Sequence, residues 1–256
     1  MENKIITSRE NETFKDLLKL TDKKWRRRMG LCIIEGEKVV RDNLHRAEQI
    51  FIREKLPSKL EGWRAGRDGV SVLSDKLWGE ISSLENDTGI LATVKIPASR
   101  EVTSPFLVLD GIQDAGNMGT LLRTAAAFGF GTVFCIDCVD VWSPKVLRAS
   151  SGTQFGLNIV ETSEFMKPKD SFLVGADLNG EGPFAVAASL RSSQRPFGIV
   201  LGNEGRGLSE RVKTQVDRFV TIPMQPGVES LNVAVAGGIL MYELTLAHKQ
   251  LSQTPL

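Results

Sequence analysis

The second half of the chain contains short, almost continuously apolar segments that alternate with longer, helix-favouring ones. A strand that is apolar on both faces must be covered on both faces, which is typical of a parallel sheet between layers of helices. The expected strands are residues 106–109, 132–136, 172–174, 198–201 and 219–222. This pattern predicts an α/β domain built on a parallel sheet.

The N-terminal part shows a similar alternation in a smaller span. Short apolar segments are expected to form strands at residues 31–34, 49–53, 70–73 and 90–94. We therefore predict a small α/β domain over residues 1–97. Residues 98–105 are polar, lie between prolines and have no periodicity, so they are expected to be a linker to a second domain at 106–256.

The cysteines and the apolar segments exclude several classes of protein. Three cysteines without a secretory leader favour a reducing compartment, so we expect a cytoplasmic protein. Cys135 and Cys138 form a single C-x-x-C with no second pair, which favours packing over a zinc site. The most apolar stretch, residues 231–247, includes Asn232 and Glu243 and is too short to span a bilayer. We predict no metal and no membrane segment.

A closing helix is expected from residue 231 to about residue 249. Its apolar residues are distributed around most of its circumference, so it must be buried on more than one face. Either a partner subunit or a deep internal position satisfies this requirement.

Three blocks place glycine, asparagine, serine and glutamate where an expected strand gives way to a helix. Open α/β sheets bind their ligands at such places. The blocks are residues 117–125, 201–207 and 222–236. Each has an ordinary explanation when taken alone: a helix cap, a glycine turn and a stiff crossover loop, respectively. The second block lacks the Lys-Ser/Thr pair of a P-loop, and no Gly-x-Gly-x-x-Gly opens the domain, which disfavours nucleoside triphosphate and dinucleotide sites.

As a set, the blocks resemble the signature motifs of the SpoU/TrmH family of RNA ribose 2′-O-methyltransferases, within the SPOUT superfamily. The agreement covers order, spacing and identity: Asn117 with Arg123, Gly202-Asn203-Glu204-Gly205, and Ser230-Leu231-Asn232-Val233. The resemblance extends over residues 105–248, and Glu35-Gly36 marks the small N-terminal substrate-binding domain of many members. It implies a SPOUT-type parallel sheet with a deep trefoil knot, which general topology rules argue against.

The resemblance also implies S-adenosylmethionine as cofactor and a homodimer formed through the closing helix. The implied catalytic residues are Arg123, Asn117, Glu204, Ser230 and Asn232. The implied cofactor-binding residues are Leu201, Gly202, Ile222, Met224 and Leu231. Because a guanidinium is a poor proton acceptor, we expect Arg123 to hold the neighbouring phosphate and to stabilise the developing alkoxide.

A basic run at residues 23–28 follows a polar, helix-favouring segment at residues 8–20. Residues 1–28 contain nine basic and five acidic side chains, although the net charge of the chain is only +1. Such a run is commonly a solvated face, but Trp25 lies within it and stacking on RNA is the open alternative. The RNA-binding candidates are Arg9, Lys23, Lys24, Arg26, Arg27 and Arg28.

The expected function is S-adenosylmethionine-dependent 2′-O-methylation of a ribose in ribosomal RNA, since a separate N-terminal domain suits a folded RNA element. The alternatives are the same reaction on transfer RNA, or a non-catalytic RNA-binding or ribosome-assembly factor on the same fold.

Overall fold

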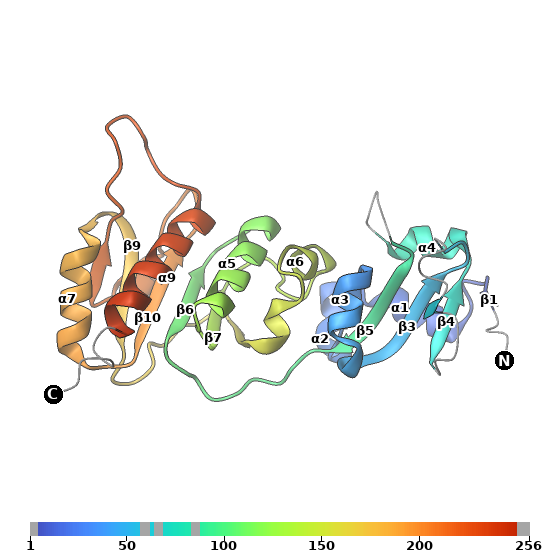
Figure 1. Cartoon of the computed structure of the whole chain (residues 1–256). Coiled ribbons are helices and arrows are strands. Elements are labelled where there is room, and N and C mark those ends of the chain that lie inside the picture. Colours follow the sequence, from blue (N-terminus) through green and yellow to red (C-terminus); the bar gives the residue numbers. More distant parts are fainter. Residues whose placement is uncertain (1–4, 57–61, 64–68, 83–87, 250–256) are drawn as a thin grey trace. The chain divides into compact units, whose positions relative to one another are not determined.

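The computed structural model describes residues 5–56, 62–63, 69–82 and 88–249 (Figure 1). The chain divides into two compact units. Unit 1 comprises Met1–Pro97 and Asp140–Gly152, and unit 2 comprises Ala98–Val139 and Thr153–Leu256. The segment Asp140–Gly152 therefore lies within the sequence of unit 2 but packs with unit 1.

Unit 1 contains a mixed five-stranded sheet with the order β1-β4-β3-β5-β2. The strands are β1 (Ile5–Ile6), β2 (Leu31–Glu35), β3 (Ala47–Arg53), β4 (Val70–Leu73) and β5 (Ile90–Lys95). Strand β4 is parallel to β1 and β3, whereas β5 is antiparallel to β2 and β3. The four strands predicted for this part of the chain are all present, and the two-residue edge strand β1 was not predicted.

Amphipathic helices cover the sheet of unit 1. They are α1 (Glu12–Lys19), α2 (Lys23–Met29), α3 (Glu37–Asp42), α4 (Asp75–Ile81) and α6 (Pro144–Ala149). Phe14 and Leu17 of α1 pack with Trp78 of α4 in one buried apolar cluster. Helix α6 contacts β2, which explains why the segment that contains it belongs to this unit.

Unit 2 contains a six-stranded, entirely parallel sheet with the order β11-β9-β10-β6-β7-β8. The strands are β6 (Phe106–Asp110), β7 (Thr132–Ile136), β8 (Asn158–Thr162), β9 (Phe172–Glu181), β10 (Phe197–Gly202) and β11 (Arg218–Val220). The predicted parallel α/β architecture is confirmed. The sequence does not predict strand β8, because only Ile159 and Val160 of its five residues are apolar and the strand lies at an edge of the sheet.

Helices α5 (Ala115–Ala127), α7 (Pro183–Ser193) and α9 (Val233–Lys249) pack side by side, with α9 in contact with both others (Figure 1). Gly237 of α9 allows this close packing, because a Cβ there would lie 2.6 Å from side-chain atoms of both Leu121 and Leu201. A separate buried cluster includes Phe106, Val108 and Val200 of the sheet with Val212 of the short helix α8 (Glu210–Lys213).

Residues 98–105 form neither helix nor strand and are hydrogen-bonded along unit 2. The Asn158 side chain bonds both the N–H and the carbonyl of Arg100, at 2.8 and 2.9 Å. The Ser104 hydroxyl accepts a bond from the Phe197 N–H at 2.9 Å. In the described ranges, no helix combines the length and apolarity needed to cross a membrane.

Candidate active site

A pocket of about 400 Å³ lies at the carboxyl end of the unit 2 sheet, beside the start of α9. Its lining includes every residue that the sequence implicated in cofactor binding: Leu201, Gly202, Ile222, Met224 and Leu231. Glu204 and Ser230 line it as well. The second and third sequence blocks therefore meet at one pocket.

Strand β10 ends at Gly202, and residues 203–207 then form a closed loop. The backbones of Asn203 and Gly207 exchange two hydrogen bonds, of 3.0 and 2.8 Å. A Cβ on Gly202 would lie only 2.4 Å from the carbonyl carbon of Gly207, so this return of the chain requires glycine.

The Asn203 side chain fixes the 203–207 loop from inside. Its Oδ1 accepts bonds from the N–H groups of Gly205 and Arg206 at 3.0 and 3.1 Å. Its Nδ2 donates to the carbonyl of Gly111 at 2.8 Å, which attaches the loop to the end of β6. Asn203 is not among the site residues that the sequence predicts. The signal that could have found it is an asparagine at the start of a glycine turn, since asparagine side chains bond nearby backbone there.

The carboxyl end of β9 supplies a further wall of the pocket. Residues Ala176, Asp177, Leu178 and Asn179 line it. The sequence predicted a strand only at 172–174, because a glycine and polar residues then interrupt the apolar run. The strand continues to Glu181, and its outer part is exposed on both faces, since Leu178 is 62% exposed and Asn179 is exposed as well.

The first block is joined to the other two by a chain of side-chain hydrogen bonds. Asp114 caps α5 by accepting a bond from the Asn117 N–H at 2.7 Å. Asn117 Nδ2 donates to Glu204 Oε1, and Asn232 Nδ2 donates to Asn117 Oδ1, both at 2.9 Å. Asn232 in turn caps α9 by accepting a bond from the Ala234 N–H at 2.9 Å. Three predicted catalytic residues, one from each block, thus form a single network.

The other two predicted catalytic residues are not bonded to this network. Ser230 is exposed on the pocket lining. Arg123 is exposed on α5 and has no hydrogen-bond or ion-pair partner among the described residues. Its side chain leaves the helix about 120° around the axis from that of Asn117. The guanidinium is therefore available to a ligand.

Comparison with known families matches residues 93–242 to the SpoU rRNA Methylase family, a span that covers more than half of the chain and includes the pocket and the network. The chain belongs to the SpoU rRNA methylase family. Residues 11–92 match a second family, the MRM3-like substrate binding domain.

Individual relatives agree with this membership along almost the whole chain. An uncharacterised tRNA/rRNA methyltransferase of Synechocystis is 34% identical, over 93% of this chain and 92% of its own length. The 23S rRNA (guanosine(2553)-2′-O)-methyltransferase RlmP of Bacillus subtilis is 30% identical, over 94% of this chain and 99% of its own. The solved structure of a putative RNA methyltransferase of the TrmH family from Porphyromonas gingivalis is 31% identical with a TM-score of 0.74, over 90% of this chain and 96% of that one.

The chemical character of the SpoU pocket follows from its lining. Leucine, isoleucine and methionine side chains form apolar walls, and Asp177, Glu204 and Arg206 add two carboxylates and one guanidinium. Such a lining suits a ligand that combines an apolar or aromatic part with charged groups. Within the described ranges, no group of three or more histidine, cysteine, aspartate or glutamate side chains could hold a metal ion.

The C-x-x-C pair lies at the end of β7 in this SpoU domain. The thiol of Cys138 donates to the Leu109 carbonyl at 3.2 Å. A hydrogen bond from Cys135, assisted by the N–H groups of Ile112 and Gly111, lowers the pKa of Cys138 against the opposing effect of burial. Both cysteines are unbridged thiols.

The basic run of the substrate-binding domain forms α2, and one of its arginines is turned into unit 1. Arg26 is only 4% exposed. Its Nε donates to Asp140 Oδ2 at 3.1 Å, its Nη2 also contacts that oxygen, and its Nη1 donates to the Leu20 carbonyl at 2.7 Å. The prediction that Arg26 binds RNA is wrong, because its donors are used inside the protein. A short amphipathic helix turns one side of any run toward the core, and a run of like charges does not reveal which residue that is.

The remaining RNA-binding candidates differ in their surroundings. Lys24, Arg27 and Arg28 are exposed, and Lys23 is half-buried. The Arg28 guanidinium lies 5.2 Å from the centre of the Trp25 ring, so this ring already contacts a cation of the protein. Arg9 forms a two-bond ion pair with Glu80, at 2.8 and 2.7 Å.

Proposed function

We propose that the protein transfers the methyl group of S-adenosylmethionine to a ribose 2′-hydroxyl of ribosomal RNA. The observation that supports this most directly is the network of Asn117, Glu204 and Asn232, which brings the three blocks together at the pocket. The RlmP relative, whose name states this chemistry on 23S rRNA, supports the same class of substrate.

The pocket has the properties that S-adenosylmethionine requires. Its volume of about 400 Å³ lies in the usual range for small-molecule sites. Leu201, Ile222, Met224 and Leu231 provide apolar surface for an adenine ring, and the crowded backbone at Gly202 provides polar groups without side chains. When bound, this cofactor supplies a methyl group on a positively charged sulfur, which departs as a neutral thioether.

The protein has to orient the 2′-hydroxyl and stabilise its developing negative charge. We assign this role to Arg123, whose guanidinium stays protonated and has no partner among the described residues. In this role it also binds the phosphate beside the target ribose, and the hydroxyl proton leaves to a phosphate oxygen or to water. Asn117, Glu204 and Asn232 hold the starts of α5 and α9 against the 203–207 loop, so their role is to shape the site together with Ser230.

The proposal includes a homodimer formed through α9. Four apolar side chains remain exposed on this helix, with 52% exposure for Val235, 37% for Ile239, 49% for Tyr242 and 41% for Leu246. Their spacing places them on one helical stripe, and an exposed stripe of this kind favours association with an apolar partner. A second copy of the chain would cover it, and sedimentation velocity would measure the resulting mass.

Three further predictions from the sequence belong to the same proposal. The deep trefoil knot is supported by the path of the chain, which passes from β10 to β11 on the far side of β9 and returns through α9 to contact β10 and α5. Residues 1–97 serve as the RNA-binding domain, 98–105 as the linker and 106–256 as the methyltransferase domain. We also propose a cytoplasmic location, with which a ribosomal substrate is consistent.

The test is methyl transfer from tritiated S-adenosylmethionine to unmodified ribosomal RNA and, separately, to unmodified transfer RNA, followed by nuclease digestion and identification of labelled 2′-O-methyl nucleosides. We expect label in ribosomal RNA. Label in transfer RNA alone would replace the proposed substrate by the alternative one. Cofactor binding without transfer to either RNA or to ribosomal particles would favour the non-catalytic factor.

Variants at Arg123 then test the mechanism. Arg123→Ala should lower methyl transfer by at least about a hundredfold, which is the typical effect of removing one group that stabilises transition-state charge. Its cofactor affinity should be unchanged. Arg191→Ala is the control, because Arg191 is a half-buried arginine of α7 whose side chain has no described partner. Equal activity of the two variants would remove Arg123 from the mechanism.

A further inference from the structure

A second pocket, of about 510 Å³, lies on the other side of the 203–207 loop. It is situated at the carboxyl ends of β6, β7 and β10, where the adjacent parallel strands of unit 2 all end. Its lining includes Asp110, Gln113, Arg206, Ser209 and Arg211. The loop that supplies Glu204 to the first pocket therefore forms one wall of both pockets.

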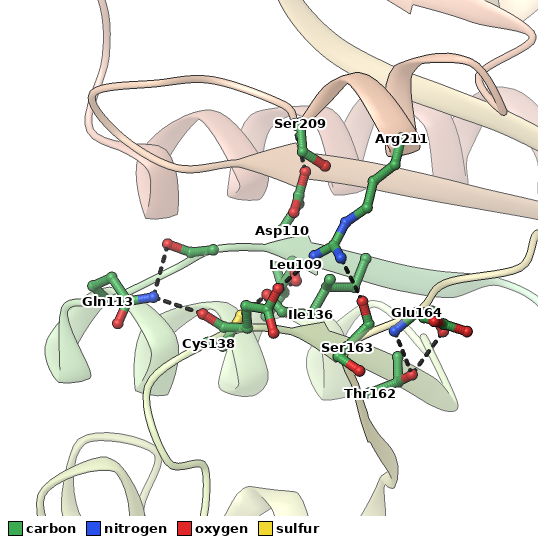
Figure 2. Close-up of polar contacts among 12 residues, drawn as sticks. Leu109, Asp110, Gln113, Ile136, Cys138, Thr162, Ser163, Glu164, Ser209 and Arg211 are labelled. Atoms are coloured by element: carbon green, nitrogen blue, oxygen red, sulfur yellow. Dashed lines mark hydrogen bonds and ion pairs between the residues drawn. The ribbon is translucent and has the colours of Figure 1, made fainter.

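The walls of this second pocket are held by specific polar contacts, several of which are drawn in Figure 2. Asp110 Oδ2 accepts a bond from the Ser209 N–H at 2.7 Å. Gln113 Nε2 donates to the Asp137 carbonyl at 2.7 Å. Arg211 donates to the Ser163 carbonyl at 2.6 Å and also pairs with the Asp137 carboxylate. Asp110, Gln113 and Arg211 are thus held in place by protein contacts before any ligand binds.

Two charged side chains of the lining, Asp110 and Arg206, have no ion-pair partner among the described residues. Of its three cations, Arg211 pairs with Asp137, and Lys213 pairs with Glu210 at 2.9 Å. The remaining carboxylate, Asp110, accepts the backbone bond described above. Arg206 is exposed, and no described residue forms an ion pair or side-chain hydrogen bond with its guanidinium.

Two uncharged polar atoms of the lining also lack a partner in the described structure. The hydroxyl oxygen of Ser209 is buried and makes no hydrogen bond. The amide oxygen of the exposed Gln113 accepts none within the described structure, since only its nitrogen is engaged. For the buried Ser209 hydroxyl, the missing partner carries a free-energy penalty that a ligand can relieve.

We propose that this pocket binds one nucleotide of the substrate RNA, next to the nucleotide that is methylated. This inference rests on the proposed function. Arg206 contacts its phosphate, while Gln113 and Ser209 bond the edge of its base. A nearly neutral lining with one free guanidinium suits a single phosphate and a polar base, whereas a polyanion would need more free cations. Splayed bases held in pockets are the usual way in which proteins read RNA loops.

The placement of Arg206 links this pocket to the choice of RNA target site. The residue belongs to the same rigid loop as Glu204, so a nucleotide bound at Arg206 fixes the RNA relative to the cofactor pocket. Discrimination between target sites would then depend on a base that is not itself modified.

The experiment measures binding of an in vitro transcribed, unmodified 23S ribosomal RNA to the full chain by filter retention at several salt concentrations. Arg206→Ala should weaken binding about tenfold and flatten the salt dependence by about one phosphate contact. Ser209→Ala should weaken RNA binding about threefold without lowering the unfolding midpoint, because it removes an unpartnered hydroxyl. Arg191→Ala serves as the control and should match the wild type.

Separate measurements distinguish this proposal from the proposed function and from binding of a free nucleotide. Calorimetric titration with S-adenosylmethionine should give the wild-type affinity for Ser209→Ala, because Ser209 does not line the cofactor pocket. RNA binding by both variants equal to that of Arg191→Ala would overturn the proposal. A second result would also overturn it: free AMP, CMP, GMP or UMP binds tightly, and Ser209→Ala weakens this binding while RNA binding stays unchanged. The pocket would then serve a free nucleotide. Normal RNA binding without methyl transfer would refute the proposed function and leave this binding result intact.

Discussion

Replacing Arg26 by alanine should destabilise unit 1 rather than weaken RNA binding directly. The substitution removes a guanidinium that bonds Asp140 through two nitrogens and the Leu20 carbonyl through the third. The side chains of Arg26 and Asp140 are only 5% and 12% exposed. Asp140 would be left as a nearly buried carboxylate without its counter-charge.

The magnitude follows from this burial. Removing one partner of a buried ion pair costs about 3–5 kcal/mol, because the other charge remains desolvated. Asp140 keeps one bond from the Trp142 N–H, at 3.2 Å, so we expect the lower end of that range, about 3 kcal/mol. This is a large part of the total stability of about 5–15 kcal/mol that is typical of natural domains.

Tryptophan fluorescence in urea measures this loss selectively. All four tryptophans, residues 25, 63, 78 and 142, lie in unit 1. At a slope of about 1.5 kcal/mol per molar urea, a loss of about 3 kcal/mol lowers the unfolding midpoint by about 2 M. The control is Lys24→Ala, an exposed position of the same helix, where a change within about 0.5 kcal/mol is expected.

A double variant separates loss of the pair from loss of packing. Arg26→Ala with Asp140→Ala removes both charges, so it should be less destabilised than the sum of the two single changes. RNA affinity, measured on folded Arg26→Ala protein, should equal that of the wild type. The reasoning fails if Arg26→Ala has the midpoint of Lys24→Ala and a lower RNA affinity, because Arg26 would then be a surface residue in solution.

Three further changes test other parts of the structure. Gly202→Ala should weaken S-adenosylmethionine binding more than tenfold in calorimetry and cost about 1–3 kcal/mol of stability, since the new Cβ meets backbone of the 203–207 loop. Gly205→Ala is the control and should have neither effect, because the atom nearest to its new Cβ lies 3.7 Å away. Asp217→Asn should destabilise unit 2 at pH 7, and this loss should shrink as the pH falls below the usual aspartate pKa. Burial opposes the shift, yet bonds from the Leu173 N–H and from a lysine lower the pKa of Asp217. Its contribution is therefore present above the unfolded pKa and is lost as pH falls through the folded one, which urea unfolding followed by circular dichroism over this pH range measures. In the native protein, iodoacetamide should alkylate Cys138 first, with a rate that rises below the usual thiol pKa. Mass mapping should find the buried Cys32 unmodified, because burial raises its pKa. Equal labelling of Cys138 and Cys32 would contradict this prediction.

The elements of the sheet were largely predictable because their signal is local. Thr132–Ile136 contains four consecutive apolar residues after its threonine, which favours a buried segment, and the strand has the predicted bounds and is buried throughout. Strand β9 shows the limit of this signal. Strand β11 pairs with it at Val174 and Gly175 and, after a register shift, at Glu181, and the sequence of a strand does not identify its pairing partner.

The residues at the cofactor pocket were predictable for a different reason. Their types and spacing match family motifs, so the sequence named Leu201, Glu204 and Ser230 without any knowledge of their positions. Asn203 is not among the predicted site residues because its side chain acts inside the loop, where it bonds backbone groups.

The sequence by itself determined the α/β class, the two-part organisation and the family, because apolar periodicity and motif spacing are properties of the chain read in order. Only the tertiary structure decided that Arg26 is a buried partner of Asp140, that Asn117, Glu204 and Asn232 bond one another, and that the 203–207 loop separates two pockets. The physical reason is common to these cases. A charged or polar side chain acquires its role from the groups that surround it after folding, and those groups come from segments far away in the sequence.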